Sequence, residues 1–216
     1  MYAAGVPQVA DLSRAPLSRV RATSVARMAT TEKTQSASRS SKRSAPGGAG
    51  ARATRRQNAE KGFVASKELG ENMQAVLVDL LELAGQGKQA HWNVVGRNFR
   101  DTHRILDEII EAAREFSDTV AERMRALHAV PDGRSDIVAA TTTLPEYPQG
   151  EIDTTETVDL ITVRLENSVG TIRGVHDAVD DEDPTSADIL HTIIEKLEQF
   201  AWMVSAENRT PAASRP

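Results

Sequence analysis

The sequence contains no cysteine among its 216 residues. Disulfide bonds, thiolate metal sites and cysteine nucleophiles are therefore excluded, which is compatible with a reducing cytoplasm. No apolar run approaches the roughly 18–20 residues of a membrane-spanning helix, and the first thirty residues lack the continuous apolar segment of a secretory signal. We therefore expect a soluble protein with no membrane partner.

Acidic residues are scarce in one part of the chain only. Residues 1–61 carry twelve Lys and Arg against three Asp and Glu, a net charge of +9, whereas the remainder carries fourteen against twenty-eight, a net charge of −14. The first segment also has almost no bulky apolar residues, so it cannot bury enough surface to offset the entropy of ordering. We expect a disordered basic tail over residues 1–61 that binds a polyanion.

Three other interpretations of this tail stay open. Its Arg-rich, Ser-rich composition also resembles an organelle leader, and Met28 is a second possible start, which would make the preceding residues irrelevant. An inert extension is the third possibility. The short segment over residues 210–216 is expected to be a flexible C-terminal tail.

From residue 67 onward, apolar residues recur with the period of an α-helix. The pattern predicts helices over about 67–92, 99–127, from 154 to an acidic run at 180–183, and from 185 onward. Residues 131–152 contain three prolines and read as a long crossover, with a short helix within 135–142, which suits a bundle whose middle helices run parallel. Thr185 and Asp188 resemble a capping box for the last helix. Four long helices and no strand signal predict an all-α four-helix bundle.

Four metal-ligating residues lie on one face of the second helix. His103 and Asp107 are one turn apart, as are Asp118 and Glu122. The two pairs are centred about 22 Å apart along the axis, so one helix cannot close them around one metal. They are, however, symmetric about the midpoint between Ala112 and Ala113, so a two-fold dimer with antiparallel helices would build two equivalent sites from split halves.

His91, near the inward face of the first helix, is expected to complete each site. The competing interpretation is that these polar residues merely border an apolar face. Trp92 is expected to lie beside the metal and absorb stray oxidising equivalents, or else to be ordinary core filler.

The sequence resembles the Dps family of mini-ferritins over about residues 62–209. The resemblance rests on the spacing H-x11-H-x3-D-x10-D-x3-E from His91 to Glu122 and on the segments "KQAHWNVVGRNFRDTH", "SDTVAERM" and "DPTSADIL". The resemblance implies a ferritin-like bundle that assembles as a hollow homododecamer. It also implies an intersubunit ferroxidase site, with one or two irons, that takes His91, His103 and Asp107 from one chain and Asp118 and Glu122 from another. Fe(II) would be oxidised there, preferably by hydrogen peroxide, and stored as a ferric mineral.

The resemblance implies two further features. Acidic pores near the start of the last helix would admit ions, with Asp183 and Asp188 as candidates, although both are also ordinary acids for a helix N-terminus. Family members with basic tails bind duplex DNA without sequence preference, which here would place the protein at the nucleoid. The candidate DNA contacts are Arg39, Lys42, Arg43, Arg52, Arg55, Arg56 and Lys61.

Two alternatives accompany this hypothesis. The protein is either an iron-oxidising storage enzyme or mainly a nucleoid-condensing protein with weak ferroxidase activity. A di-iron site within one chain, as in bacterioferritin, would need Glu-x-x-His motifs on two helices, and no Glu in the sequence has a His three residues later.

Overall fold

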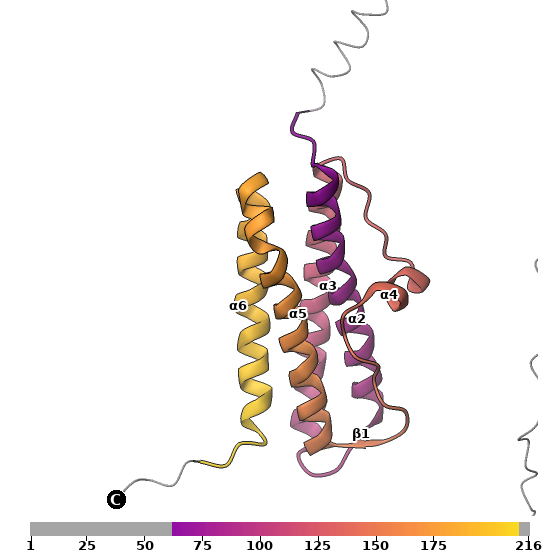
Figure 1. Ribbon diagram of the computed structural model, residues 1–216. Coiled ribbons are helices and arrows are strands. Elements are labelled where there is room, and N and C mark those ends of the chain that lie inside the picture. Colours follow the sequence, from indigo (N-terminus) through magenta and orange to yellow (C-terminus); the bar gives the residue numbers. More distant parts are fainter. Residues whose placement is uncertain (1–61, 212–216) are drawn as a thin grey trace, which may run out of the picture. The chain divides into compact units, whose positions relative to one another are not determined.

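The computed structural model describes residues 62–211, in which the long helices form a bundle (Figure 1). The helices are α2 Lys67–Asn93, α3 Phe99–Ala126, α4 Ser135–Thr141, α5 Thr154–Glu182 and α6 Pro184–Ala206. The predicted all-α bundle and the short crossover helix are both confirmed. The basic tail over residues 1–61, with its candidate DNA contacts, and residues 212–216 lie outside the described part of the chain.

The core lies between the apolar faces that the sequence pattern predicts. Helix α2 packs against α3 and α5, and α5 packs against α6. Each of the four long helices contributes residues with no exposed surface, including Leu80, Ile109, Ile161 and Leu197. Because burying one such side chain contributes roughly 1.5–3 kcal/mol, this continuous apolar seam holds the helices together. Within residues 62–211, no helix has both the length and the apolar composition needed to cross a membrane.

Two short strands, which the sequence analysis did not expect, link the helix ends. Strand β1, Val94–Val95, pairs in parallel with β2, Ile152–Asp153. Two residues are too few to show the alternation that marks a strand in a sequence. The pairing brings the start of α3 and the start of α5 to one end of the bundle, so these helices run parallel, as the long crossover predicts.

The connection from β1 to α3 is tight because of one glycine. Gly96 has φ of +115°, and a Cβ at this position would lie 3.4 Å from Thr154 Oγ1. Glycine adopts this conformation without a steric penalty. Asn98, also at positive φ, then precedes α3. This turn sets the register in which the end of α2 meets the start of α3.

The boundary between α5 and α6 differs from the prediction. Helix α5 continues through the acidic run to Glu182, and α6 begins at Pro184 with Asp183 at its N-cap. Thr185 therefore lies inside the helix, and the predicted capping box with Asp188 is wrong. The reason is that proline at the first helical position has a preset φ and needs no hydrogen bond, which moves the start of α6 one residue earlier.

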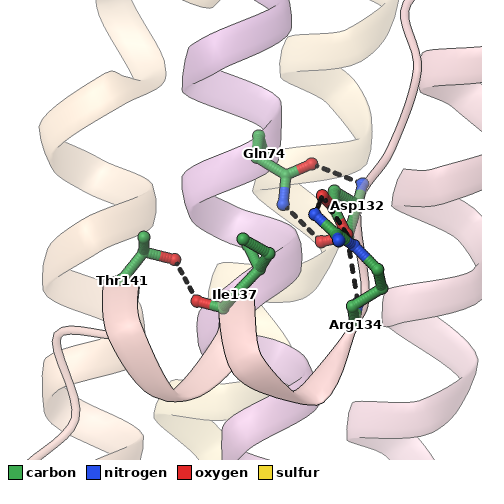
Figure 2. A network of polar contacts seen from close by, with 5 residues as sticks. All are labelled: Gln74, Asp132, Arg134, Ile137 and Thr141. Carbon is green, nitrogen blue, oxygen red and sulfur yellow. Dashed lines mark hydrogen bonds and ion pairs between the residues drawn. The ribbon is translucent and has the colours of Figure 1, made fainter. Parts of the chain in front are cut away.

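The crossover is fastened to α2 by Gln74 (Figure 2). The Gln74 side-chain amide donates to the backbone carbonyl of Asp132 at 2.7 Å and accepts from its N–H at 2.9 Å. The Asp132 carboxylate pairs with Arg134 at 2.7 Å. Within α4, the Thr141 hydroxyl donates to the carbonyl of Ile137. The two Gln74 hydrogen bonds therefore fasten the chain between α3 and α4 to α2.

A buried carboxylate holds the other end of α4. Asp79 of α2 is only 2% exposed. It accepts hydrogen bonds from the Thr142 hydroxyl at 2.9 Å, the Thr143 backbone N–H at 2.8 Å and hydroxyl at 2.6 Å, and the Thr171 hydroxyl at 2.7 Å. Such full satisfaction is what makes a buried carboxylate tolerable. Asp79 therefore ties α2, the crossover and α5 together.

Arg164 of α5 fastens the last part of the crossover. Its side chain is almost fully buried. The guanidinium donates to Gln86 and to the backbone carbonyls of Pro145 and Glu146, and it lies 4.8 Å from the centre of the Tyr147 ring. Burial lowers the pKa of Arg164 from its usual value. The donated hydrogen bonds compensate for the cost of burying this cation.

Candidate metal centre

Three of the predicted ligands come together where α2 meets α3. His91 lies in the last turn of α2, and His103 and Asp107 lie on successive turns near the start of α3. One potential ligand atom from each residue lies within 4.8 Å of the others. Within the described part of the chain, this is the only group of three or more such side chains at this spacing. The structure thus brings these three predicted residues together, and their binding of a metal stays a prediction.

The cluster is compact and partly shielded from solvent. His91 Nε2 lies 2.9 Å from Asp107 Oδ1, and the His91 side chain is only 11% exposed. The two imidazoles stack with their centroids 3.6 Å apart. The Nδ1 of His103 lies 3.1 Å from the backbone carbonyl of His91. If Nδ1 carries the proton it donates to that carbonyl, which leaves the Nε2 of His103 free to bind a metal.

The environment of His91 fits a metal ligand. Both of its ring nitrogens are buried, and neither forms a hydrogen bond with the described residues. The 2.9 Å contact with Asp107 has the distance of a hydrogen bond but not its angle. A buried polar group without a partner is costly. A cation bound beside Asp107 would satisfy the free nitrogen, and an imidazole–carboxylate donor set suits iron.

Two residues of this site were missed by the sequence analysis. Lys88 Nζ lies 3.0 Å from Asp107 Oδ1, and the Phe99 ring lies 5.1 Å from the ring of His103. The hydrogen bond from Lys88, and then the contact with His91, hold the pKa of Asp107 below its usual value. The position of Lys88, three residues before His91, was the available signal, because such residues share a helix face.

Asp118 and Glu122 lie farther along α3 and outside this cluster. Both are exposed, and Asp118 lies eleven positions after Asp107, about 16 Å along the axis. Asp118 lines a cavity of about 350 Å³ together with Leu77, Leu81 and Pro131. One chain therefore carries two separated sets of candidate ligands. That a second copy unites them stays a prediction.

Three large apolar residues close to the histidines in the sequence are exposed. Trp92 is 69% exposed, and Phe99 and Val95 are 44% and 40% exposed. Trp92 is thus not core filler in the single chain, although its role as a shield for the metal stays a prediction. Exposed apolar residues that gather beside a polar site are typical of a surface that another protein covers.

The two pore candidates have different surroundings. Asp183 is buried, and its carboxylate accepts hydrogen bonds from Arg123 at 2.7 Å and from the Ser186 hydroxyl. Asp188 is exposed on the first turns of α6. Of the two, only Asp188 has a carboxylate that an arriving ion can reach directly. An ion-entry role for either residue stays a prediction.

Comparisons with known proteins agree with the fold. The model of the ferritin-like domain matches residues 70–210. DNA protection during starvation protein 2 of Deinococcus radiodurans is 34% identical over 143 residues, covering 65% of this chain and 58% of that protein. DNA protection during starvation protein of Agrobacterium fabrum is 32% identical over 131 residues, covering 60% of this chain and 81% of that protein.

A solved structure supports the same fold. The crystal structure of Dps92 from Deinococcus radiodurans superimposes with a TM-score of 0.65 at 33% identity, covering 67% of this chain and 88% of that one. The bundle and its matching family model define a ferritin-like protein. Within that class, the chain belongs to the Dps family.

Proposed function

We propose that this protein binds and oxidises Fe(II) and stores the ferric product inside a shell of twelve subunits. The observation that carries the proposal is the cluster of His91, His103 and Asp107, in which a buried imidazole has no hydrogen bond and faces a carboxylate. Membership of the Dps family supports the same activity. The iron is the substrate and the stored cargo.

The three clustered residues form one half of the proposed site. They supply too few ligands to enclose a metal, while Asp118 and Glu122 leave their carboxylates exposed on the same helix. A two-fold axis crossing α3 near its midpoint would bring Asp118 and Glu122 of a second copy to the cluster, and the first copy would reciprocate. The exposed ring of Trp92 and its apolar neighbours would then be covered by the second copy.

The donor set suits oxidation of iron. Neutral imidazoles from His91 and His103 bind Fe(II), and the anionic oxygens of Asp107, Asp118 and Glu122 stabilise Fe(III) relative to Fe(II). In the reaction with hydrogen peroxide, two Fe(II) ions each give up one electron, the O–O bond breaks, and two protons are taken up to give two waters. Few protein ligands per iron leave coordination positions open for the oxidant.

The charge of the bundle favours delivery of cations. Residues 62–216 carry a net charge of −14, which raises the local concentration of cations. Asp188, exposed near the start of α6, is the better candidate for an entry pore, since Asp183 already pairs with Arg123. Peroxide is the proposed oxidant by likeness to the family.

DNA binding is the second proposed function, and the charge asymmetry favours it. The body would repel phosphate, so the +9 tail over residues 1–61 would have to supply the attraction. Twelve tails on one shell would act multivalently and strengthen a weak contact. The two functions combine if the protein lies in the cytoplasm at the nucleoid, where it would remove iron and peroxide next to DNA.

Rapid-mixing kinetics of the full chain test the iron proposal. Fe(II) is loaded without oxygen, hydrogen peroxide is added, and the ferric absorbance is followed. Asp107→Asn should slow oxidation by about 100-fold, while Glu108→Gln, an exposed acid on the same turn, should behave as wild type. Equal rates in wild type and Asp107→Asn would contradict the proposal.

A further inference from the structure

Two histidines outside the proposed ferroxidase site face each other across α5 and α6. The Nε2 atoms of His176 and His191 lie 2.7 Å apart, and their ring centroids lie 4.5 Å apart. The His176 side chain is 19% exposed and that of His191 is 60% exposed. The pair therefore lies at the surface of the α5–α6 hairpin, with one ring largely covered and the other free to adjust.

Each of these histidines has a carboxylate next to its other ring nitrogen. His176 Nδ1 lies 3.1 Å from Asp177 Oδ1, and His191 Nδ1 lies 3.8 Å from Asp188 Oδ1. The first contact is a hydrogen bond. The second is longer but still close enough for electrostatic attraction. Since a carboxylate only accepts, both contacts favour the tautomer with the proton on Nδ1.

This tautomer leaves a lone pair on each Nε2. A neutral imidazole carries one N–H, so two rings protonated at Nδ1 would point two lone pairs at each other across 2.7 Å. That arrangement is repulsive unless a metal ion lies between the nitrogens or one ring carries its proton on Nε2 and donates it to the other. The neighbouring contact between the same helices, Arg173 with Glu198 at 2.5 Å, is by contrast an ion pair that needs no third partner.

We propose that His176 and His191 bind a divalent transition-metal ion of the Zn(II) type through their Nε2 atoms. Imidazole is a preferred ligand of such ions, and a ligating histidine usually donates its other N–H to a carboxylate, which is the role that Asp177 and Asp188 would have. Two nitrogens at about 2.1 Å from one tetrahedral ion lie about 3.4 Å apart. The Nε2 atoms, now 2.7 Å apart, therefore need to separate by about 0.7 Å, which the exposed His191 ring can accommodate.

The site would differ in character from the proposed ferroxidase centre. Both histidines belong to one chain and to helices other than α2 and α3, so no second copy is needed to complete it. Only two protein ligands are supplied, and water would fill the other positions beside the exposed His191. We therefore expect an exchangeable site that binds the metal without oxidising it. A shared proton between the rings is the competing occupant.

Calorimetric titration of the full-length protein with Zn(II) distinguishes a bound metal ion from a shared proton. His103→Gln and Asp107→Asn are first introduced together so that the other cluster does not compete. This background should bind one additional Zn(II) per subunit compared with the same background carrying His191→Gln. Asp177→Asn should weaken the binding about tenfold. His128→Asn is the matched control, because it removes one imidazole elsewhere and asparagine tolerates the positive φ at that position.

A second readout identifies the ligands. The chain has only five histidines, and residues 1–61 contain none. The electron paramagnetic resonance spectrum of Cu(II) bound to the background variant should therefore show coupling to two nitrogens, which His191→Gln removes. Equal Zn(II) stoichiometry with and without His191 would overturn the proposal and leave only a shared proton. Iron oxidation enters neither readout, so failure here is independent of the proposed ferroxidase activity.

Discussion

His91 Nε2 lies 2.9 Å from Asp107 Oδ1, although the two residues belong to different helices. The contact exists because the turn through Gly96 returns the chain so that the end of α2 meets the start of α3. It places an imidazole and a carboxylate side by side before any ion arrives. Half of the proposed iron site is therefore built by the fold of a single chain.

Lys88 is expected to compete with iron for Asp107. Its ammonium hydrogen-bonds to the Asp107 carboxylate and lowers the pKa of that carboxyl below 3.8. In Lys88→Met the competing cation is lost, so Fe(II) should bind more tightly near neutral pH, by up to about tenfold. The Asp107 pKa would rise toward its ordinary value, so binding should start to fail at a higher pH as the solution is acidified.

Anaerobic Fe(II) titrations between about pH 4 and pH 7 measure both effects. Lys67→Met is the matched control, because Lys67 forms an exposed ion pair with Glu71 on the same helix. If Lys88→Met changes neither the Fe(II) affinity nor the pH at which binding fails on acidification, Lys88 does not compete with iron for Asp107.

Asp79 is expected to be a main stabilising residue of the crossover. Asp79→Ala removes the acceptor for three threonine residues in a buried setting, which should cost roughly 2–4 kcal/mol of unfolding free energy. Urea denaturation measures this, with exposed Glu115→Ala as the control. A loss as small as that of the control would mean that water replaces the carboxylate without penalty.

Asp183 should make the stability depend on pH in the acid range. Burial tends to raise its pKa, but hydrogen bonds from Ser186 and then Arg123 lower it below 3.8 overall. Because the folded pKa is depressed, this contribution is fully present above the unfolded pKa of about 3.8 and is lost as the pH falls through the folded value. Asp183→Asn should therefore destabilise the protein by roughly 1–3 kcal/mol at neutral pH.

The difference in unfolding free energy between wild type and Asp183→Asn should become smaller below about pH 3.8. Thermal unfolding across this range measures it. Asp132→Asn breaks an exposed pair with Arg134 and should have little effect at any pH. A constant difference down to the lowest pH would show that Asp183 does not titrate in this window.

The helices and half of the site could be predicted from the sequence because their signals are local. The apolar residues that recur along α3, such as Ile109, Ala113 and Val120, are all buried as predicted. His103 and Asp107 share a helix face, and one tight turn is enough to bring His91 to them. Helical periodicity and one short connection are therefore enough to predict these helices and the positions of these three residues.

Contacts between distant segments could not be predicted in the same way. Asp79 and Arg164 lie among apolar positions, but their partners are fixed only by the path of the crossover. Strands of two residues carry no periodic signal, and the pairing of His176 with His191 depends on the register of α5 against α6. The roles of Asp118 and Glu122 depend on a second copy of the chain.

The basic tail is expected to carry all DNA binding. The full chain should retard duplex DNA of any sequence at low salt, and its affinity should fall steeply with salt as counterions are released. A variant containing only residues 62–216 should not bind, because its net charge is negative, yet it should oxidise iron like the full chain. Equal DNA retention by both forms in gel-shift assays would exclude the tail as the binding element.

The central claim, that each iron site is shared between two chains, predicts complementation between inactive variants. Asp107→Ala and Asp118→Ala disable opposite halves of the proposed site. When the two chains are mixed unfolded and reassembled at equal amounts, about one quarter of the sites should combine an intact Asp107 with an intact Asp118 of the other chain.

The most direct measurement is therefore the rate of peroxide-driven Fe(II) oxidation by the reassembled mixture, with the native mass of every sample recorded. We expect each variant alone to assemble but to be inactive, and the mixture to recover about one quarter of the wild-type rate. A fully assembled mixture that remains as inactive as its components would contradict the shared site.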